Sequence, residues 1–287
     1  MLCQGKGDDI AKVISGREKG GRVPTGIDGF DQLVEGGIPR GSNVLVTGLP
    51  GTGKTIFGLN FLYKGALLGE NGLYISIDSS SERLKLQGLR FDWDLETMEK
   101  TGKLFFLRIP LNKVKFNLFE VIEKIKNEIN AERVVLDNLA TFAINAGFFA
   151  MRLGEGGEGE PSPALFDVDK VGGEVAGGEG ADKNGIAYAS KSSKRMAYMI
   201  VEKLAELGTT NLIITYGNRN STHITVDGIS EFSCDGIVEL YNELIGNKRM
   251  RTMSILKMRA TAHSPYLHDF DFGKNGIVVK PAEPVYK

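Results

Sequence analysis

The stretch from residue 48 to residue 55 has the clearest chemical meaning in this sequence. It reads GLPGTGKT and fills every fixed position of the phosphate-binding loop G-x-x-x-x-G-K-[ST]. The apolar run 43–47 precedes it, and apolar residues at helical spacing follow over 56–68. A glycine-rich turn with a chance lysine is the alternative, but it does not account for both flanks. We therefore expect a nucleotide-binding turn between a strand and a helix.

The residue types in this loop suit the binding of phosphate groups. Gly48, Gly51 and Gly53 permit backbone conformations that a Cβ atom forbids, so that N–H groups can point inward around the phosphates. Lys54 is expected to reach the β- and γ-phosphates, and the Thr55 hydroxyl is expected to bind Mg²⁺. The predicted cofactor-binding positions are the whole loop: Gly48, Leu49, Pro50, Gly51, Thr52, Gly53, Lys54 and Thr55.

A second candidate element is the run VVLD at residues 134–137. It ends an apolar strand in a carboxylate, which can hold the water shell of Mg²⁺ or touch the metal opposite Thr55. Apolar runs that end in aspartate are common, so the run alone says little. Together with the phosphate loop, it predicts that Asp137 is the metal aspartate.

The acid that would activate water for hydrolysis is sought at the end of another strand. The run 73–77 leads into Asp78, and a carboxylate at the end of such a strand can serve as a general base beside the γ-phosphate. Glu82 follows closely, but Ser79 and Glu82 have the spacing of a helix capping box. We therefore predict Asp78 and Lys54 as the catalytic residues, with Asp78 as the general base, and a capping role for Glu82.

Bulk properties limit the class of protein. The chain has 287 residues, 41% of them hydrophobic, which is enough to bury one large α/β core. The formal net charge of −1 argues against a general nucleic-acid-binding surface. Cys3 and Cys234 form neither a metal cluster nor a disulfide framework, so we expect a reducing, cytoplasmic environment. No apolar run approaches the roughly 18 residues of a membrane span, and the N-terminus does not resemble a signal peptide.

The order of the predicted elements indicates an α/β fold. Short apolar strands alternate with helices, as in a mostly parallel sheet that helices wrap on both faces. Strands are expected at 44–47, 73–77, 104–107, 133–136 and 211–215, and helices at 56–68, 81–89, 118–130 and about 193–207. Strands at 236–241, 251–258 and 277–280 then follow without helices, and a tight Gly-Asn turn lies within 245–248. These last strands predict an antiparallel C-terminal extension of the sheet.

Two segments fall outside this pattern. Residues 1–22 form an N-terminal arm, and the domain itself is expected over 23–287. Residues from about 152 to 190 are dense in glycine and glutamate, a composition that buries too little apolar surface to offset the entropy of ordering. We expect a flexible acidic insertion, and the alternative is an arm that binds a partner or regulates the protein.

Several motifs, taken in order, resemble a known family. They are VPTGIDGFDQLVEGGIPRGSNVLVTGLPGTGKT, GLYISID with SERL, VVLDNL, SEFSCDGIVEL, and ILKMRATAH with the terminal GIVV. The chain is similar over residues 23 to 287, apart from the insertion, to the KaiC branch of the RecA-like ATPases, in particular to its single-domain members. The resemblance implies a RecA-like P-loop NTPase fold, ATP with Mg²⁺, and a homo-oligomeric ring, usually of six subunits, with ATP bound between neighbours.

The resemblance also gives a role to residues near the C-terminus. Lys257, Arg259, Thr261 and His263 match the K-x-R-x-T-x-H run of the family, which reaches the nucleotide held by the adjacent subunit. Alternation on a strand would project Lys257 and Arg259 to the same side, where a cation can neutralise charge on the γ-phosphate. The alternative is a solvated basic strand edge that includes residues 248–251.

This sequence departs from the family pattern at two places. Asp78 and Ser79 stand where the family usually has two glutamates, the first of which activates the water. Aspartate is one methylene shorter, and a misplacement of about 1 Å can lower a rate on the order of a hundredfold, so slow hydrolysis is expected. In the family, a clock protein is phosphorylated on an adjacent Ser-Thr pair in its second half. Glu231 and Phe232 stand at the matching positions here, so self-phosphorylation at this place is not expected.

These observations favour one function and leave two others open. The sequence predicts an ATP-binding, slowly hydrolysing oligomer that uses its nucleotide state as a switch in regulation or signalling, with an unidentified regulatory protein as partner. A RadA/RecA-type DNA recombination or repair ATPase would need DNA-binding loops or an added basic module, which are not evident. A nucleotide-binding scaffold without turnover is the third reading, and Asp78 in place of glutamate is the feature that supports it.

Overall fold

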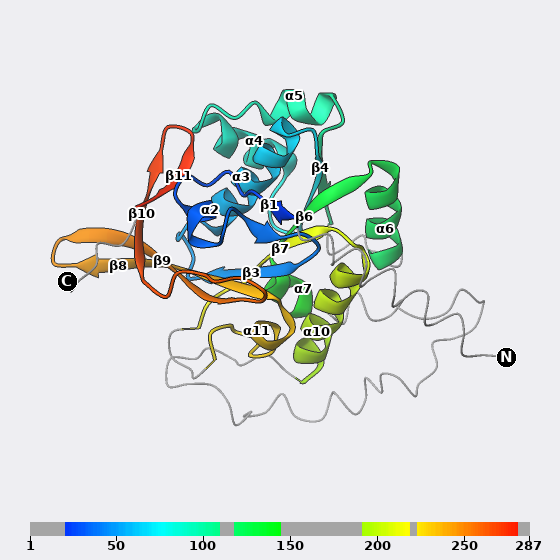
Figure 1. Ribbon diagram of the computed structural model, residues 1–287. Helices are drawn as coiled ribbons and strands as arrows, with labels where there is room; N and C mark the ends of the chain where they lie inside the picture. The colour runs from blue at the N-terminus through cyan, green and yellow to red at the C-terminus, as the bar shows by residue number, and fades with distance from the viewer. Residues whose placement is uncertain (1–20, 110–117, 145–190, 219–222, 281–287) are drawn as a thin grey trace.

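The computed structural model describes residues 21–109, 118–144, 191–218 and 223–280. Their central element is a 9-stranded sheet with the order β11-β10-β9-β8-β3-β7-β6-β4-β5 (Figure 1). The strands from β8 to β5 in this order pair in parallel, and β9, β10 and β11 add an antiparallel extension. The predicted α/β fold with an antiparallel C-terminal extension is therefore confirmed.

The strands of the large sheet follow the apolar runs of the sequence. They are β3 (Asn43–Gly48), β4 (Asn71–Ser76), β5 (Leu104–Arg108), β6 (Ala131–Asp137), β7 (Thr210–Ile214), β8 (Gly236–Ile245), β9 (Lys248–Met258), β10 (His268–Gly273) and β11 (Gly276–Val279). A separate 2-stranded sheet pairs β1 (Arg22–Val23) with β2 (Ile38–Pro39). Between β8 and β9 lies the predicted two-residue turn, and Gly246 in it has a φ of 64°, which favours glycine.

Helices cover both faces of the sheet (Figure 1). The described helices are α2 (Phe30–Leu33), α3 (Lys54–Leu67), α4 (Ser81–Leu89), α5 (Leu95–Lys100), α6 (Leu118–Glu128), α7 (Leu139–Ile144), α10 (Lys191–Glu206) and α11 (Ser230–Ser233). Successive residues of β3 show how the strands serve both layers: Val44 and Val46 join the core beneath α3, whereas Leu45 joins the core beneath α6, α7 and α10. This doubly covered sheet explains why its strands are continuous apolar runs.

The predicted elements are all present, with boundaries shifted by a few residues. The prediction omitted the strands β1, β2 and β10 and the short helices α2, α5, α7 and α11. In β10 the sequence HDFDFG interleaves aspartates with buried phenylalanine, and its pairing with β9 covers only two residue pairs, so local sequence gives a weak strand signal. The predicted arm and insertion (1–22 and 152–190) lie almost wholly outside the described residues, and their assignment stays a prediction.

Candidate nucleotide site

The phosphate loop joins β3 to α3 at the carboxyl end of the parallel strands, which is where open α/β sheets bind ligands. Two of its glycines are required by close packing. A Cβ atom on Gly48 would collide with the carbonyl oxygen of Leu240 on β8, and one on Gly53 would lie 2.7 Å from Cζ of Phe272 on β10. Both glycines also have positive φ, 146° and 106° respectively. The loop backbone thus packs closely against β8 and β10, two strands that the sequence alone did not connect with it.

The side chain of Lys54 folds back toward the first residues of the phosphate loop. Its Nζ donates hydrogen bonds to the carbonyl oxygens of Gly48 at 2.6 Å and Leu49 at 2.9 Å. The ammonium stands 5.3 Å from the ring centroid of Tyr216. Burial lowers the pKa of Lys54 to about 8, although the negative charge of Asp137 opposes that shift. A buried cation satisfied by loop carbonyls is ready to exchange them for phosphate oxygens.

Thr55 and Asp137 meet, as the prediction of a metal pair requires. The Thr55 hydroxyl donates to Oδ2 of Asp137 at 2.8 Å, and the Tyr74 hydroxyl donates to the same oxygen at 2.6 Å. Burial raises the pKa of Asp137, and these two hydrogen bonds act in the opposite direction. A hydroxyl and a carboxylate at the end of a strand form the oxygen donor set that suits Mg²⁺.

Tyr74 was not predicted as part of the site. It lies in the middle of β4 and is fully buried, and burial holds the pKa of its hydroxyl well above the ordinary value. The residue type alone could have indicated it, because a tyrosine between apolar strand residues usually has a hydrogen-bond partner for its buried hydroxyl. Which partner it finds depends on β4 lying beside β6.

Asp78 lies at the cleft but just beyond its strand, because β4 ends at Ser76. Its Oδ2 accepts hydrogen bonds from Asn138 Nδ2 at 3.2 Å and from Thr141 Oγ1 at 3.3 Å. Asn138 Nδ2 also lies 3.2 Å from the hydroxyl oxygen of Tyr216. The predicted base Asp78 is therefore tied to Asn138, the residue that follows Asp137, through contacts that sequence analysis missed.

The predicted capping box at the start of α4 is wrong. The N-cap is Ser80, whose hydroxyl accepts a hydrogen bond from the backbone N–H of Arg83, and Ser79 instead donates its own N–H to the Ser76 hydroxyl. Three serines in a row offer three possible caps, and the chain path out of β4 selects the second. Glu82 remains in the first turn of the helix, on the surface.

These groups surround a cleft of about 430 Å³. Phosphate-loop residues line one part of it, and Asp78, Asp137, Tyr216 and Phe272 are among the residues that line the rest. Its volume is within the range of small-molecule sites. The open glycine backbone, the buried lysine and the Thr55–Asp137 pair fit a nucleotide with a divalent cation.

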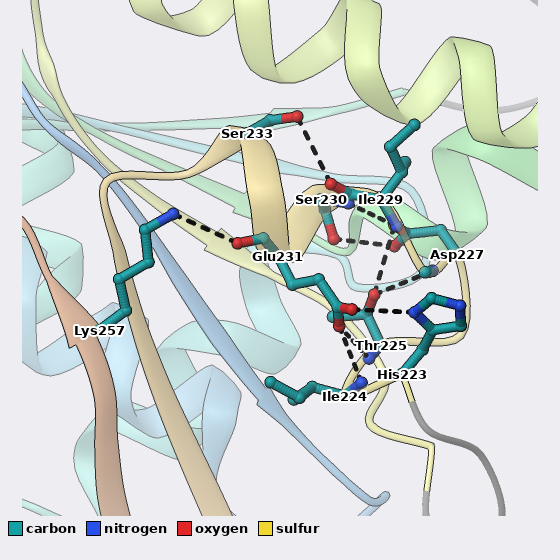
Figure 2. Close-up of polar contacts among 10 residues, drawn as sticks. His223, Ile224, Thr225, Asp227, Ile229, Ser230, Glu231, Ser233 and Lys257 are labelled. Carbon is teal, nitrogen blue, oxygen red and sulfur yellow. Dashed lines mark hydrogen bonds and ion pairs between the residues drawn. The ribbon is translucent and has the colours of Figure 1, made fainter.

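The C-terminal basic run lies elsewhere in the same chain. Lys257 Nζ donates to the carbonyl oxygen of Cys234 at 2.6 Å and lies 3.4 Å from those of Glu231 and Phe232 (Figure 2 shows Lys257 directed at Glu231). Arg259 pairs with Asp235 at 3.2 Å. Neither residue lines the cleft of its own chain. Although β9 ends at Met258, the backbone N–H of Arg259 still donates to the carbonyl oxygen of Asp235 at 2.9 Å, and the role of Lys257 and Arg259 at a neighbour's nucleotide stays a prediction.

The remaining members of the run also have local partners. Thr261 Oγ1 accepts a hydrogen bond from Arg22 at 2.6 Å and lies 3.2 Å from the carbonyl oxygen of Arg259. His263 Nδ1 lies 3.1 Å from the carbonyl oxygen of Ser264. The run thus packs against α11 and the segment around β1 in its own chain.

Glu231 and Phe232 differ sharply in their surroundings. The Glu231 carboxylate is buried and accepts hydrogen bonds from the backbone N–H groups of Ile224 at 2.8 Å and Thr225 at 3.1 Å, with His223 Nδ1 at 3.0 Å (Figure 2). Phe232 is 65% exposed. Glu231 therefore has a structural task, since it fastens the segment before α11 to that helix.

Comparisons with known proteins agree with this geometry. The family model described as the KaiC ATPase matches residues 23–150 and 187–284. The circadian clock oscillator protein KaiC of Parasynechococcus marenigrum is 30% identical over 270 residues, which cover 91% of this chain and 45% of that protein. The UPF0273 protein of Thermotoga maritima is 27% identical over 278 residues, which cover 91% of this chain and 97% of that protein.

A solved structure extends the likeness to three dimensions. The KaiC-like protein of the hyperthermophilic archaeon Pyrococcus horikoshii OT3 is 30% identical, with a TM-score of 0.69, over 91% of this chain and 99% of that chain. The chain spans about half the length of the KaiC relatives it matches, and nearly the whole of the UPF0273 protein. With its sheet order and its phosphate loop, the chain belongs to the family of KaiC-like ATPases within the RecA-like superfamily.

Proposed function

We propose that this protein binds ATP with Mg²⁺, hydrolyses it slowly, and uses the nucleotide state of a homo-oligomer as a switch in regulation or signalling. The observation that carries the proposal is one cleft in which Lys54 is held by loop carbonyls beside the Thr55–Asp137 pair. A bound Mg²⁺ would supply positive charge that neutralises the phosphates. The loop backbone and Lys54 would hold the triphosphate in place, which is most of what phosphoryl transfer requires of a protein.

Slow hydrolysis is proposed from the position of Asp78. It is the acidic side chain beyond β4 that lines the cleft, so it is our candidate for the group that accepts a proton from water. Its Oδ2 is already engaged by Asn138 and Thr141, and its side chain is one methylene shorter than glutamate. Both features reduce its reach, and poor placement of a base lowers the rate steeply.

The oligomer is proposed from where the basic run lies. Lys257 and Arg259 do not line the cleft of their own chain, so they can contact a bound nucleotide only if it is held by another copy. In such a contact, phosphate oxygens would share these cations with their present partners in the α11 segment. A ring of copies, six by analogy with the family, satisfies this requirement, since head-to-tail contacts close into rings.

The location of the protein belongs to the same proposal. Within the described residues, no helix combines the length and the apolar character needed to cross a bilayer. We place the protein in the cytoplasm, with the domain over 23–287 and the acidic insertion 152–190 as an appended arm.

One alternative is favoured by a specific observation. Because Asp78 is one methylene shorter than glutamate and is held by Asn138 and Thr141, the protein can also be read as a nucleotide-binding scaffold without turnover. Phosphate release from purified protein, with and without single-stranded DNA, separates the readings. We expect slow release that DNA does not change and that Asp137→Asn abolishes. No release above the Asp137→Asn background would favour the scaffold, and strong stimulation by DNA would favour a recombinase.

A further inference from the structure

The hydrogen bonds on Asp137 are unevenly distributed over its carboxylate. Oδ2 accepts one from Thr55 at 2.8 Å and one from Tyr74 at 2.6 Å. A carboxylate oxygen has two lone pairs, so these two donors fill it. Among the residues that the structure describes, no hydrogen bond reaches Oδ1.

We propose that Tyr74 is a positioning residue for the metal aspartate, which fixes the Asp137 carboxylate by Oδ2 and leaves Oδ1 available toward the metal. The inference rests on the Mg²⁺ of the proposed function. Partners of this kind are a general feature of metal sites, where hydrogen bonds behind a ligating group orient it, and their loss weakens metal affinity by about 10- to 100-fold.

Thr55 can share this task. Its hydroxyl oxygen is the group that the phosphate-loop motif assigns to Mg²⁺, and a hydroxyl that binds a cation through its oxygen still has its proton to donate to Asp137. Tyr74 differs because the motif assigns its hydroxyl no metal. Its hydrogen bond holds Oδ2 from β4, independently of what the Thr55 oxygen binds.

The setting of Tyr74 suits a fixed donor. Its ring is fully buried, and it packs beneath α3 at 6.1 Å from the centroid of Phe106 on β5. Its strand β4 pairs with β6 up to Ser76 and Asp137, so the tyrosine and the aspartate belong to neighbouring strands of one rigid sheet. A preorganised site needs its groups held within about 0.5 Å, and packing on a strand is the kind of support that limits such movement.

A simpler reading is that Asp137 merely satisfies the hydroxyl of a core tyrosine. Both readings predict a loss of stability when the hydroxyl is removed. They differ in metal dependence, because only a positioning role makes the apparent affinity for Mg²⁺ depend on Tyr74.

The test uses Tyr74→Phe and titrates a fluorescent ATP analogue without metal and with increasing Mg²⁺. We expect affinity without metal to stay within about twofold of wild type and the half-saturating Mg²⁺ concentration to rise about 10- to 100-fold. Electron paramagnetic resonance of Mn²⁺ in place of Mg²⁺ reads metal binding directly. The matched control is Tyr241→Phe, which also removes a tyrosine–carboxylate hydrogen bond, to Glu239 at 2.7 Å, away from the cleft.

The outcomes distinguish this inference from the proposed function. If wild type binds the analogue and responds to Mg²⁺ while Tyr74→Phe responds identically, the positioning role is wrong. If wild type binds no analogue, or binds it without any effect of Mg²⁺, the proposed function fails instead. A double variant guards against a general folding defect: adding Tyr74→Phe to Asp137→Asn should change Mg²⁺ dependence no further, and an added loss of tenfold or more would overturn the inference.

Discussion

Lys54 shows how a single residue is prepared for its ligand. Its ammonium is buried and satisfied by the carbonyl oxygens of Gly48 and Leu49, so the loop carries a positive charge close to where phosphates are expected. Desolvation makes that charge costly, as the lowered pKa records. A bound polyphosphate would relieve the cost by supplying a stronger, anionic partner.

We predict that Lys54→Ala weakens binding of a fluorescent ATP analogue by about ten- to hundredfold, because a hydrogen bond to a charged group is worth about 1.5–3 kcal/mol. Equilibrium titration of the purified variant measures this. The control Lys124→Ala removes an exposed lysine on α6 with the same change of charge and should bind like wild type. If wild type, Lys54→Ala and Lys124→Ala bound the analogue with equal affinity, the assignment of the nucleotide site to this loop would be wrong.

Asp78 gives the second prediction at this scale. If it is a poorly placed base, Asp78→Glu should raise turnover by tenfold or more, and Asp78→Asn should lower it by about 10²-fold or more, with little change in ATP affinity. Steady-state phosphate release from wild type, Asp78→Glu and Asp78→Asn measures the turnover of each. The control is Asp92→Asn, an exposed acid paired with Lys274 outside the cleft. Rates that are equal across the Asp78 series would show that another group activates the water.

At the scale of elements, Arg133 ties three segments together behind the site. It is buried on β6, its Nε donates to Glu70 at 2.6 Å, and its Nη1 donates at 2.8 Å to the carbonyl oxygens of Pro24 and Phe61. The segment after β1, helix α3 and strand β6 thus share one guanidinium. Helix α3 carries Lys54 and Thr55, so this tie also supports the site.

We expect Glu70→Ala to lower the free energy of unfolding by about 3 kcal/mol, since it leaves the buried Arg133 charge without its ionic partner. Urea denaturation measures this. Glu96→Ala removes an exposed pair with Lys100 and should change stability by no more than about 0.5 kcal/mol. If the two variants were equally stable, the buried pair would contribute no more than a surface pair.

Local patterns in the sequence were enough to predict the longer helices and most strands of the large sheet, and the phosphate loop with them. The loop is a contiguous motif, and each parallel strand is a buried apolar run, so neither depends on distant contacts. The hydrogen bond from Tyr74 to Asp137 could not be foreseen, because it joins residues 63 apart and requires β4 to lie beside β6. The hydrogen bond from Lys257 to the carbonyl oxygen of Cys234, just after α11, could not be foreseen for the same reason. For Lys257, the resemblance to the family predicted a contact with another subunit instead.

At the scale of the whole molecule, the question is what completes the cleft. The described chain holds its basic run against α11, away from its own phosphate loop. A second copy that brings this run to the nucleotide would make ATP part of the subunit interface. ATP would then stabilise the assembly by mass action, because it binds the assembled form more tightly than separate subunits.

The loss of the run should therefore weaken assembly. We predict that the double variant Lys257→Ala with Arg259→Ala binds ATP at its own phosphate loop but forms less of the ATP-dependent oligomer and turns over more slowly. The matched control is Lys248→Ala with Arg249→Ala, which makes the same change of charge at the other end of β9. Equal assembly and turnover in both double variants would show that Lys257 and Arg259 have no role at a neighbour's nucleotide and belong to a solvated basic strand edge.

Light scattering after size-exclusion chromatography, with and without Mg·ATP, tests the oligomeric switch most directly. We predict that the wild-type mass rises to that of a closed oligomer when Mg·ATP is present, and that it falls when the nucleotide is removed. A wild-type protein that keeps the same mass in both conditions would contradict the proposal that nucleotide state controls assembly.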